Sequence, residues 1–406
     1  MSRPGLREVI RRTRTNGIAD SGRRVVRRLY RVLDSRMDLS SVDFPLDDRD
    51  IASSSAMRNR TAPAPGWHDV LNIGWLCTPP QAGSGGHTTF FRMVRGLEER
   101  GHRCTILLYD RHGGDLERHR AAIRRGWPEL NAKIETVPVS LEGFDACVAS
   151  SWETAHVLAS RAPAGSGLAA YYFIQDYEPY FYPRGSLYSL AEESYRFGFT
   201  NLALGEMVAS TLRRELGLDS ECITYGSDLS SYSMRNKGTR AGVVFFARPG
   251  VDRRGYEMGR LALLEFHRRH PDHEIHIYGS KVRGWGIPLI QHGVLGAEEL
   301  NDLYNRTCAG LALSFTNITL VAAEMLAAGN IPVVNDHEFA RPMLRNPEVV
   351  WSQPTPTLLA DALSSVVTDP ERSARSARAA AYTAPDWAVA QSEVSRLLTG
   401  KAAWTV

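Results

Sequence analysis

The most constraining feature of the sequence is a regular alternation of short apolar strands with helices, which runs twice along the chain. The first series extends from residue 70 to about residue 230, and the second starts at Val243. Strands separated by helices of this length are typical of a parallel, doubly wound sheet, because parallel neighbours need a crossover connection. We therefore expect an α/β protein with two Rossmann-like domains, joined near residues 229–240. The cleft that they face is the default ligand site.

The length of the chain, 406 residues, is sufficient for two such domains with large cores. We place an extension and linker at 1–66, the domains at 67–230 and 231–385, and a final helix at 386–406 that crosses back to the first domain. The sequence has no apolar run near the roughly 20 residues of a membrane span and no apolar N-terminal signal. Five scattered cysteines fit a reducing compartment, so we expect a cytoplasmic protein.

The net charge of +3 is unevenly distributed. Residues 1–37 hold eleven arginines and three acidic residues, so the rest of the chain carries a net charge of −5. Apolar residues at helical spacing among these arginines predict a basic amphipathic helix, suited to the inner, anionic face of a membrane. A solvated extension is an equally open interpretation, and the lack of interleaved aromatics disfavours nucleic-acid binding. The triplet Asp48–Asp50 imitates a metal-binding motif but follows no strand, so we expect no metal site.

One strand–helix–strand unit, residues 310–334, carries a single charged side chain in an apolar helix. That side chain is Glu324, and Gly329 and Asn330 end the helix before the strand Ile331–Val334. An ionised carboxylate in this setting needs partners, because its desolvation alone costs on the order of several kcal/mol. We favour a pair of ligand hydroxyls at the carboxyl edge of a parallel sheet as the partner. The alternative is a carboxylate that faces solvent or a structural arginine.

This unit resembles the donor-binding signature of family 4 glycosyltransferases, which have the two-domain GT-B fold. In that family two glutamates eight positions apart bracket the turn and the helix. Glu324 matches the second glutamate, to which the resemblance assigns the nucleotide ribose, whereas the first falls on Thr316. Thr316, Asn317 and Thr319 therefore stand where a sugar-side carboxylate and its turn would be. In this departure the chain resembles bacterial rhamnosyltransferases, which build surface polysaccharides and S-layer glycans from dTDP-rhamnose. The sugar of this donor is a 6-deoxy sugar, so it offers fewer hydroxyls for a carboxylate to bind.

The segment Phe245–Gly255 also resembles the family, at the place where two cations neutralise the donor diphosphate. Arg248 matches the family arginine, and Arg254 takes the place of the family lysine, with Arg253 as the alternative. Two guanidiniums suit a departing diphosphate because they stabilise the charge that develops on it. The resemblance implies a catalytic role for Arg248 and Arg254. The alternative is a pair of surface arginines in a loop.

The ends of the next two strands resemble the family's nucleobase-binding turn. The resemblance implies that Gly279, Gly293 and Val294 contact the base, partly through backbone groups that glycine exposes. Lys281 is predicted to reach the diphosphate, with an exposed lysine as the alternative.

Two segments of the first domain are expected to face the cleft. Glycines before a helix let backbone amides approach a phosphate, and the resemblance places Gly86 and His87 against the donor phosphate or the acceptor. A nicotinamide site is disfavoured, because these glycines begin five residues past the strand. Asp176 and Glu178 lie in an aromatic-rich segment after a strand and are predicted acceptor contacts, with a catalytic role for Asp176. A buried Asp176 that caps the following turn is the alternative.

From these features we predict a retaining, metal-independent glycosyltransferase, specifically a rhamnosyltransferase. Its donor is a nucleotide sugar, expected to be dTDP-rhamnose, and its acceptor is a glycan or a lipid-linked glycan. We expect no cofactor and no nucleic-acid partner. A nucleotide-sugar 2-epimerase of the same fold and a non-catalytic module that binds sugar nucleotides or glycans are the alternatives.

Overall fold

A computed structural model describes residues 44–56, 70–80, 84–162, 167–227, 230–318, 320–381 and 384–400. The chain forms two compact units, Met1–Ile51 and Ala52–Val406. The described part of the first unit contains the short 3-10 helix η1 (Asp48–Asp50). The basic helix predicted within residues 1–37 lies outside the described residues.

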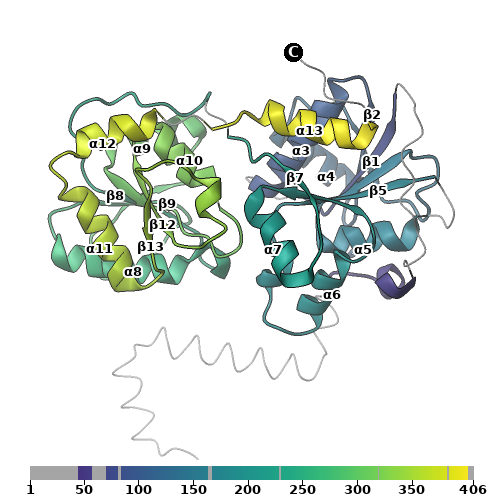
Figure 1. Ribbon diagram of the computed structural model, residues 1–406, viewed down its shortest axis with the longest axis horizontal. Helices are drawn as coiled ribbons and strands as arrows, with labels where there is room; N and C mark the ends of the chain where they lie inside the picture. The colour runs from purple at the N-terminus through teal and green to yellow at the C-terminus, as the bar shows by residue number, and fades with distance from the viewer. Residues whose placement is uncertain are drawn as a thin grey trace, which may run out of the picture. The chain divides into compact units, whose positions relative to one another are not determined.

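The first α/β half of the larger unit is built on a seven-stranded sheet in the order β3-β2-β1-β4-β5-β6-β7 (Figure 1). Neighbouring strands are parallel, as the alternation predicts, and the order reverses direction between β1 and β4. The strands are β1 (Asn72–Cys77), β2 (Arg103–Leu108), β3 (Lys133–Thr136), β4 (Ala146–Ala149), β5 (Ala169–Ile174), β6 (Thr200–Leu204) and β7 (Glu221–Ile223).

Helices cover both faces of this sheet, so its central strands are almost entirely buried. Figure 1 shows α3 and α13 on one side and α5, α6 and α7 on the other. The helices are η2 (Ser54–Ala56), α3 (Gly85–Glu98), α4 (Leu116–Gly126), α5 (Trp152–Arg161), η3 (Glu178–Phe181), α6 (Ser186–Ser194), α7 (Glu206–Leu216) and α13 (Trp387–Thr399).

The second α/β half has a six-stranded parallel sheet in the order β10-β9-β8-β11-β12-β13. Its strands are β8 (Val243–Ala247), β9 (Ile275–Gly279), β10 (Ile290–Gly293), β11 (Ala309–Leu311), β12 (Ile331–Asn335) and β13 (Val350–Ser352). Its helices are η4 (Asp252–Arg254), α8 (Tyr256–Arg269), α9 (Ala297–Arg306), α10 (Leu320–Ala327), η5 (Arg341–Met343), α11 (Pro356–Val367) and α12 (Arg372–Ala380). The predicted class, two doubly wound α/β domains, is confirmed.

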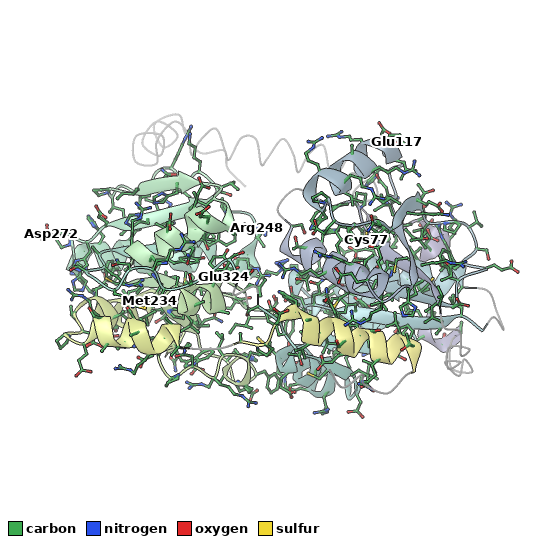
Figure 2. The ribbon with its side chains drawn as sticks, turned by 90° about the horizontal axis from the view of Figure 1, so that it is seen from above. Cys77, Glu117, Met234, Arg248, Asp272 and Glu324 are labelled. Atoms are coloured by element: carbon green, nitrogen blue, oxygen red, sulfur yellow. The ribbon has the colours of Figure 1, made fainter. Side chains whose placement is uncertain are left out.

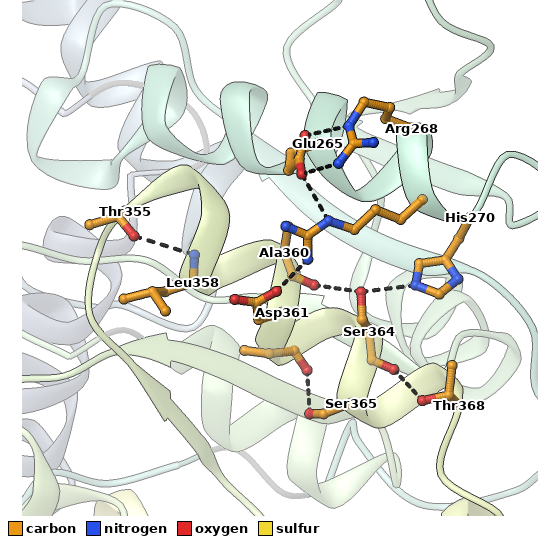
Figure 3. Close-up of polar contacts among 12 residues, drawn as sticks. Glu265, Arg268, His270, Thr355, Leu358, Ala360, Asp361, Ser364, Ser365 and Thr368 are labelled. Atoms are coloured by element: carbon orange, nitrogen blue, oxygen red, sulfur yellow. Dashed lines mark hydrogen bonds and ion pairs between the residues drawn. The ribbon is translucent and has the colours of Figure 1, made fainter.

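Polar contacts join α8 to α11 on one face of this second sheet (Figure 3). The side chain of Arg269 bonds both Glu265 on its own helix and Asp361 on α11. His270 directly follows α8, and its Nε2 lies 2.9 Å from Oγ of Ser364 on α11, which is a second polar contact between the two helices. These bonds hold α8 in place, and α8 begins directly after the arginine-bearing turn η4.

The last helix, α13, packs against α3 of the first half. Gln391 donates a hydrogen bond to the carbonyl of Arg92, and the Tyr171 hydroxyl donates to the carbonyl of Leu397. A Cβ on Gly96 would lie 2.7 Å from the Gln391 side chain, so the two helices approach closely only because residue 96 is glycine.

Three elements are missing from the sequence prediction: β3, β13 and α12. The two strands are short, with one buried residue each, and α12 is an arginine- and alanine-rich helix with only two buried residues, so none carries a clear apolar pattern. The apolar pattern of the sequence predicts a helix over residues 88–100. Helix α3 begins three residues earlier, at Gly85, because the Ser84 side chain caps it by accepting from the His87 amide. No described helix combines the length and apolar character that a membrane span requires.

Candidate functional site

A cavity of about 440 Å³ lies at the carboxyl ends of strands from both sheets. Its lining includes Thr78 and Ser150, which follow β1 and β4, and Arg248 and Ala312, which follow β8 and β11. These strands flank the point in each sheet where the strand order reverses. Ligands of open α/β sheets bind at such switch points, so the topology alone marks this cavity as the candidate site.

Three arginines follow β8 and line the cavity. The exposed Arg248 lies in the loop, and Figure 2 labels it together with Glu324. Arg254 Nη1 donates to Ser314 Oγ at 2.8 Å, and its Nη2 lies 3.8 Å from Asp176 Oδ2. The Arg253 guanidinium lies 4.2 Å from the centroid of the Phe181 ring, and burial lowers its pKa. The cavity therefore carries a concentrated positive charge on the side of the second half.

Glu324, on α10, lines the same cavity and is partly exposed. Burial raises the pKa of the neighbouring Tyr278 hydroxyl, and the negative charge of Glu324 raises it further. Arg248 and Glu324, which the sequence assigns to one ligand, thus lie in one cavity.

The turn at Ser314–Ile318 is bonded to the first half. Thr316 Oγ1 donates to Asp176 Oδ1 at 2.8 Å, and Asn317 Nδ2 donates to the Gln175 carbonyl at 2.6 Å. The Tyr225 hydroxyl, at the end of the first sheet, donates to the Ile318 carbonyl at 3.2 Å. Thr316 and Asn317 are each 3% exposed, so these bonds are protected from water. Thr319, also predicted to bind the donor, lies outside the described residues.

The two carboxyl groups of the aromatic-rich segment have different surroundings. Asp176 sits between Thr316 and Arg254, and its side chain is 13% exposed. Glu178 Oε2 accepts from the Trp152 amide and the Tyr172 hydroxyl at 2.5 and 2.8 Å. Burial raises the pKa of Glu178 well above its usual value, and the nearby charge of Glu153 adds to the rise. The first half therefore presents one hydrogen-bonded carboxylate and one carboxyl group that favours its neutral form.

His87 and Gly86 lie in the first turn of α3, at the cavity wall. His87 Nε2 lies 3.0 Å from the Thr78 carbonyl, so Nε2 carries the proton, and Nδ1 accepts from Ser84 Oγ at 2.8 Å. Burial lowers the pKa of His87, so the ring is neutral at neutral pH. The Gly86 carbonyl accepts from Gln175 Nε2 at 3.0 Å. Both ring nitrogens of His87 are thus engaged in fixing the loop.

The residues predicted to hold the nucleobase are not part of the cavity lining. Val294 is 90% exposed, Gly293 is the last residue of β10, and Lys281 lies in the loop after β9. Gly279 packs against the ring of Phe246, which does line the cavity. Its φ is +91°, and a Cβ on this residue would lie 2.6 Å from that ring. Their contact with a base stays a prediction.

Several lining residues were missed in the sequence. Phe245 and Phe246 belong to β8 itself, and the others follow apolar strands. The rule that ligand contacts sit at the carboxyl ends of parallel strands predicts a place in the site for such residues. They include Ser150, Ser151, Phe181, Tyr225, Phe245 and Phe246.

The comparison with known sequences adds two similarities. Residues 241–364 match the family described as WsaF, C-terminal domain. Over 337 residues the chain is 29% identical to the O-antigen biosynthesis protein RfbC of Myxococcus xanthus. The aligned region covers 78% of this chain and 26% of RfbC. The chain thus spans about a quarter of the length of this relative.

Solved structures match most of the chain. HepE of Anabaena, in complex with UDP-glucose, has a TM-score of 0.62 at 14% identity, covering 82% of this chain and 100% of HepE. Sucrose-phosphate synthase of Thermosynechococcus elongatus has a TM-score of 0.59 at 12% identity, covering 80% and 98%. The chain has the GT-B fold. WaaG, a glycosyltransferase involved in lipopolysaccharide biosynthesis, shares it with a TM-score of 0.56 at 14% identity over 81% of this chain and 100% of WaaG.

Proposed function

We propose that the chain is a glycosyltransferase that transfers a sugar from a nucleotide diphosphate donor to a glycan or lipid-linked acceptor of the cell surface. The observation that carries the proposal is one cavity, at the switch points of both sheets, that contains Arg248, Arg254 and Glu324. The similarities to RfbC and to WaaG, both named for the synthesis of surface polysaccharides, support the biological setting. The HepE complex with UDP-glucose supports the class of donor.

The second half would hold the donor. The guanidiniums that follow β8 stabilise the leaving diphosphate, on which negative charge develops as the bond to the sugar breaks. Glu324 accepts hydrogen bonds from ribose hydroxyls. The donor thus lies across the second sheet with its diphosphate at the end of β8 and its nucleoside toward α10.

The first half would hold the acceptor. Asp176 accepts a hydrogen bond from an acceptor hydroxyl, and the neutral carboxyl of Glu178 donates one to a sugar oxygen. His87 shapes this wall of the cavity, since its ring nitrogens are already engaged. Positioning two bound substrates in this way lowers the entropic part of the barrier.

We further propose that the donor is dTDP-rhamnose. At the turn where the family resemblance calls for a sugar-side carboxylate, this chain has Thr316, whose hydroxyl is bonded to Asp176. The wall beside it is apolar and includes Leu313, Ile318 and Val321. Such a wall suits the methyl group of a 6-deoxy sugar better than a hydroxymethyl group. Retention without a divalent metal is proposed on the family resemblance, with guanidiniums neutralising the diphosphate.

A thermal-shift panel of dTDP-rhamnose, dTDP-glucose, UDP-glucose and UDP-N-acetylglucosamine tests the proposal, because a ligand that binds only the folded chain raises its melting temperature. We expect the largest rise with dTDP-rhamnose. We also expect Arg248→Ala and Glu324→Ala to remove the rise and the exposed control Arg268→Ala to keep it. No shift with any nucleotide sugar, and no sugar transfer to a glycan acceptor, would overturn the proposal.

The basic segment 1–37 is proposed to dock the enzyme on an anionic membrane face, near a lipid-linked acceptor. We expect deletion of residues 1–40 to weaken binding to vesicles that contain an anionic lipid. Equal binding of the full and shortened chains contradicts this part of the proposal.

A further inference from the structure

Arg253 is the central arginine of the turn η4 and has an unusual hydrogen-bonding state. It lines the cavity, but its Nη1 is buried, and within the described part of the chain Nη1 has no hydrogen-bond partner. A buried donor without a partner destabilises the folded state, and more so when the group is charged. Because Arg253 lines the cavity, a group bound there would supply the missing acceptor.

The position of the Arg253 side chain is fixed by a contact from the other half. Its guanidinium carbon lies 4.2 Å from the centroid of Phe181, which ends η3 of the first half. A cation over an aromatic ring is attracted to the negative face of the ring. The ring of a phenylalanine has no oxygen or nitrogen acceptor, so this contact holds the guanidinium without a hydrogen bond from its N–H donors. Phe181 therefore orients Arg253 and leaves its donors available.

Arg254, the neighbouring residue, is in the opposite state. Its Nη1 donates to Ser314 Oγ at 2.8 Å and approaches the Asn317 carbonyl at 3.5 Å, while Nη2 lies 3.8 Å from Asp176. These partners belong to the turn at 314–318 and to the end of β5. Arg254 thus ties the second half to the first, with Nη1 hydrogen-bonded and Nη2 paired with a carboxylate before any ligand arrives.

The electrostatic surroundings of Arg253 favour an anion. Burial lowers its pKa, the positive charges of Arg254 and Arg248 lower it further, and the negative charge of Asp176 opposes this from the first half. An oxyanion bound near Nη1 relieves the repulsion among the three guanidiniums and supplies the missing acceptor.

We propose that Arg253 positions an oxygen of the ligand's diphosphate through Nη1, with Phe181 as its support, and that Arg254 is a structural link between the halves. This inference rests on the proposed function and deepens it, because it assigns the diphosphate contact of the same cavity to a different residue. It reverses the order of the sequence prediction, in which Arg254 takes the place of the family lysine and Arg253 is the alternative.

Isothermal titration with inorganic pyrophosphate, dTDP and thymidine tests the assignment, since thymidine lacks the diphosphate. We expect Arg253→Met to weaken pyrophosphate and dTDP binding at least tenfold while thymidine binding stays unchanged. Arg253→Lys, which keeps the charge, should lose less, and Phe181→Leu should weaken both anions about three- to tenfold with the charge in place. The matched control Arg268→Met lies on α8 outside the cavity and should bind like the wild type.

Arg254→Met separates the two roles, because we expect it to lower the melting temperature more than Arg253→Met does. Wild-type affinity for pyrophosphate and dTDP in a folded Arg253→Met or Arg253→Lys chain would overturn the inference. If the same Arg253 variant also transfers sugar at the wild-type rate, the proposed function is supported and the role given to Arg253 is wrong. Conversely, Arg253-dependent binding of pyrophosphate in a chain that transfers no sugar would support the inference and contradict the proposed function.

Discussion

The two α/β halves share a strand order around the cavity but present opposite chemistry to it. The first half contributes Asp176 and Glu178 from the end of β5, and the second half contributes three arginines from the end of β8. The difference lies in residues only one to seven positions past the strands. The topology therefore fixes where the cavity lies, and a few residues after each strand decide which half presents carboxyl groups to it and which presents guanidiniums.

The halves also differ in how completely their polar groups are bonded within the protein. Glu178 and His87 each have two protein partners, so this wall is rigid before a substrate binds. On the other wall Arg253 keeps a buried donor without a partner among the described residues. We infer that the acceptor side is preorganised and that the donor side is completed by its ligand.

The largest expected effect is the loss of Arg248. Removing one preorganised group that stabilises developing charge typically lowers the rate by about 10²–10³-fold. We expect Arg248→Ala to lower kcat/KM for sugar transfer by this factor, measured with the donor that the thermal-shift panel selects, while Arg268→Ala has little effect. If the variant keeps the wild-type rate, Arg248 does not stabilise the leaving diphosphate, and the proposed functional difference between the halves is wrong.

Glu178 offers a pH test of the first half. Its pKa is raised by burial and then by Glu153, so the folded state holds its proton more tightly than the unfolded state does. Below the unfolded pKa both states are protonated and nothing is lost. As pH rises from there toward the folded pKa, the free energy of unfolding falls by up to about 1.4 kcal/mol per pH unit.

We expect Glu178→Gln to remove much of this fall, because the amide oxygen can still accept from Trp152 and Tyr172. Urea unfolding of both chains at pH 5 and pH 8 measures it. A stability difference between wild type and variant that is the same at both pH values would show that the carboxyl group is ionised in the folded state.

The bond between the halves at Thr316 has a smaller expected effect. Thr316→Val removes the donor to Asp176 and keeps the shape of the side chain, so we expect a loss of about 1–2 kcal/mol in unfolding free energy. A double-mutant cycle with Asp176→Ala should show a coupling of at least 0.5 kcal/mol, since the two residues are in contact. Strict additivity would mean that the bond does not contribute in solution.

The smallest effect distinguishes two glycines of the second half. Both have positive φ, so alanine costs about 1 kcal/mol at either position. At Gly279 the new Cβ would also meet Phe246 at 2.6 Å and the Ala247 carbonyl at 2.8 Å, whereas Gly293 has open space. We expect Gly279→Ala to be the more destabilising by about 1 kcal/mol or more in urea unfolding. Equal losses would show that the wall at Phe246 yields without strain.

The sequence predicts the buried parts of the fold well, because long apolar patterns determine them. The apolar patterns of the sequence predict a strand over 243–247 and a helix over 297–306, and β8 (Val243–Ala247) and α9 (Ala297–Arg306) have these bounds. Short edge strands such as β3 and β13 are missed, since pairing with a neighbour, and not their own apolar pattern, makes them strands.

The site residues also divide into those that local sequence predicts and those that it does not. Arg248 and Glu324 follow from local motifs, and both line the cavity. The contacts of Thr316 with Asp176 and of Arg253 with Phe181 join residues far apart in sequence, and nothing in either segment encodes its partner. The division of labour between Arg253 and Arg254 likewise depends on the position of Ser314, which a one-dimensional pattern does not specify.

A crystal structure of the chain with dTDP bound is the most direct test of these proposals. We expect the diphosphate in the cavity, with oxygens within hydrogen-bond distance of Arg248 and Arg253, and a sugar hydroxyl of the nucleoside on Glu324. A nucleotide bound outside this cavity, or a diphosphate turned away from the arginines, would contradict them.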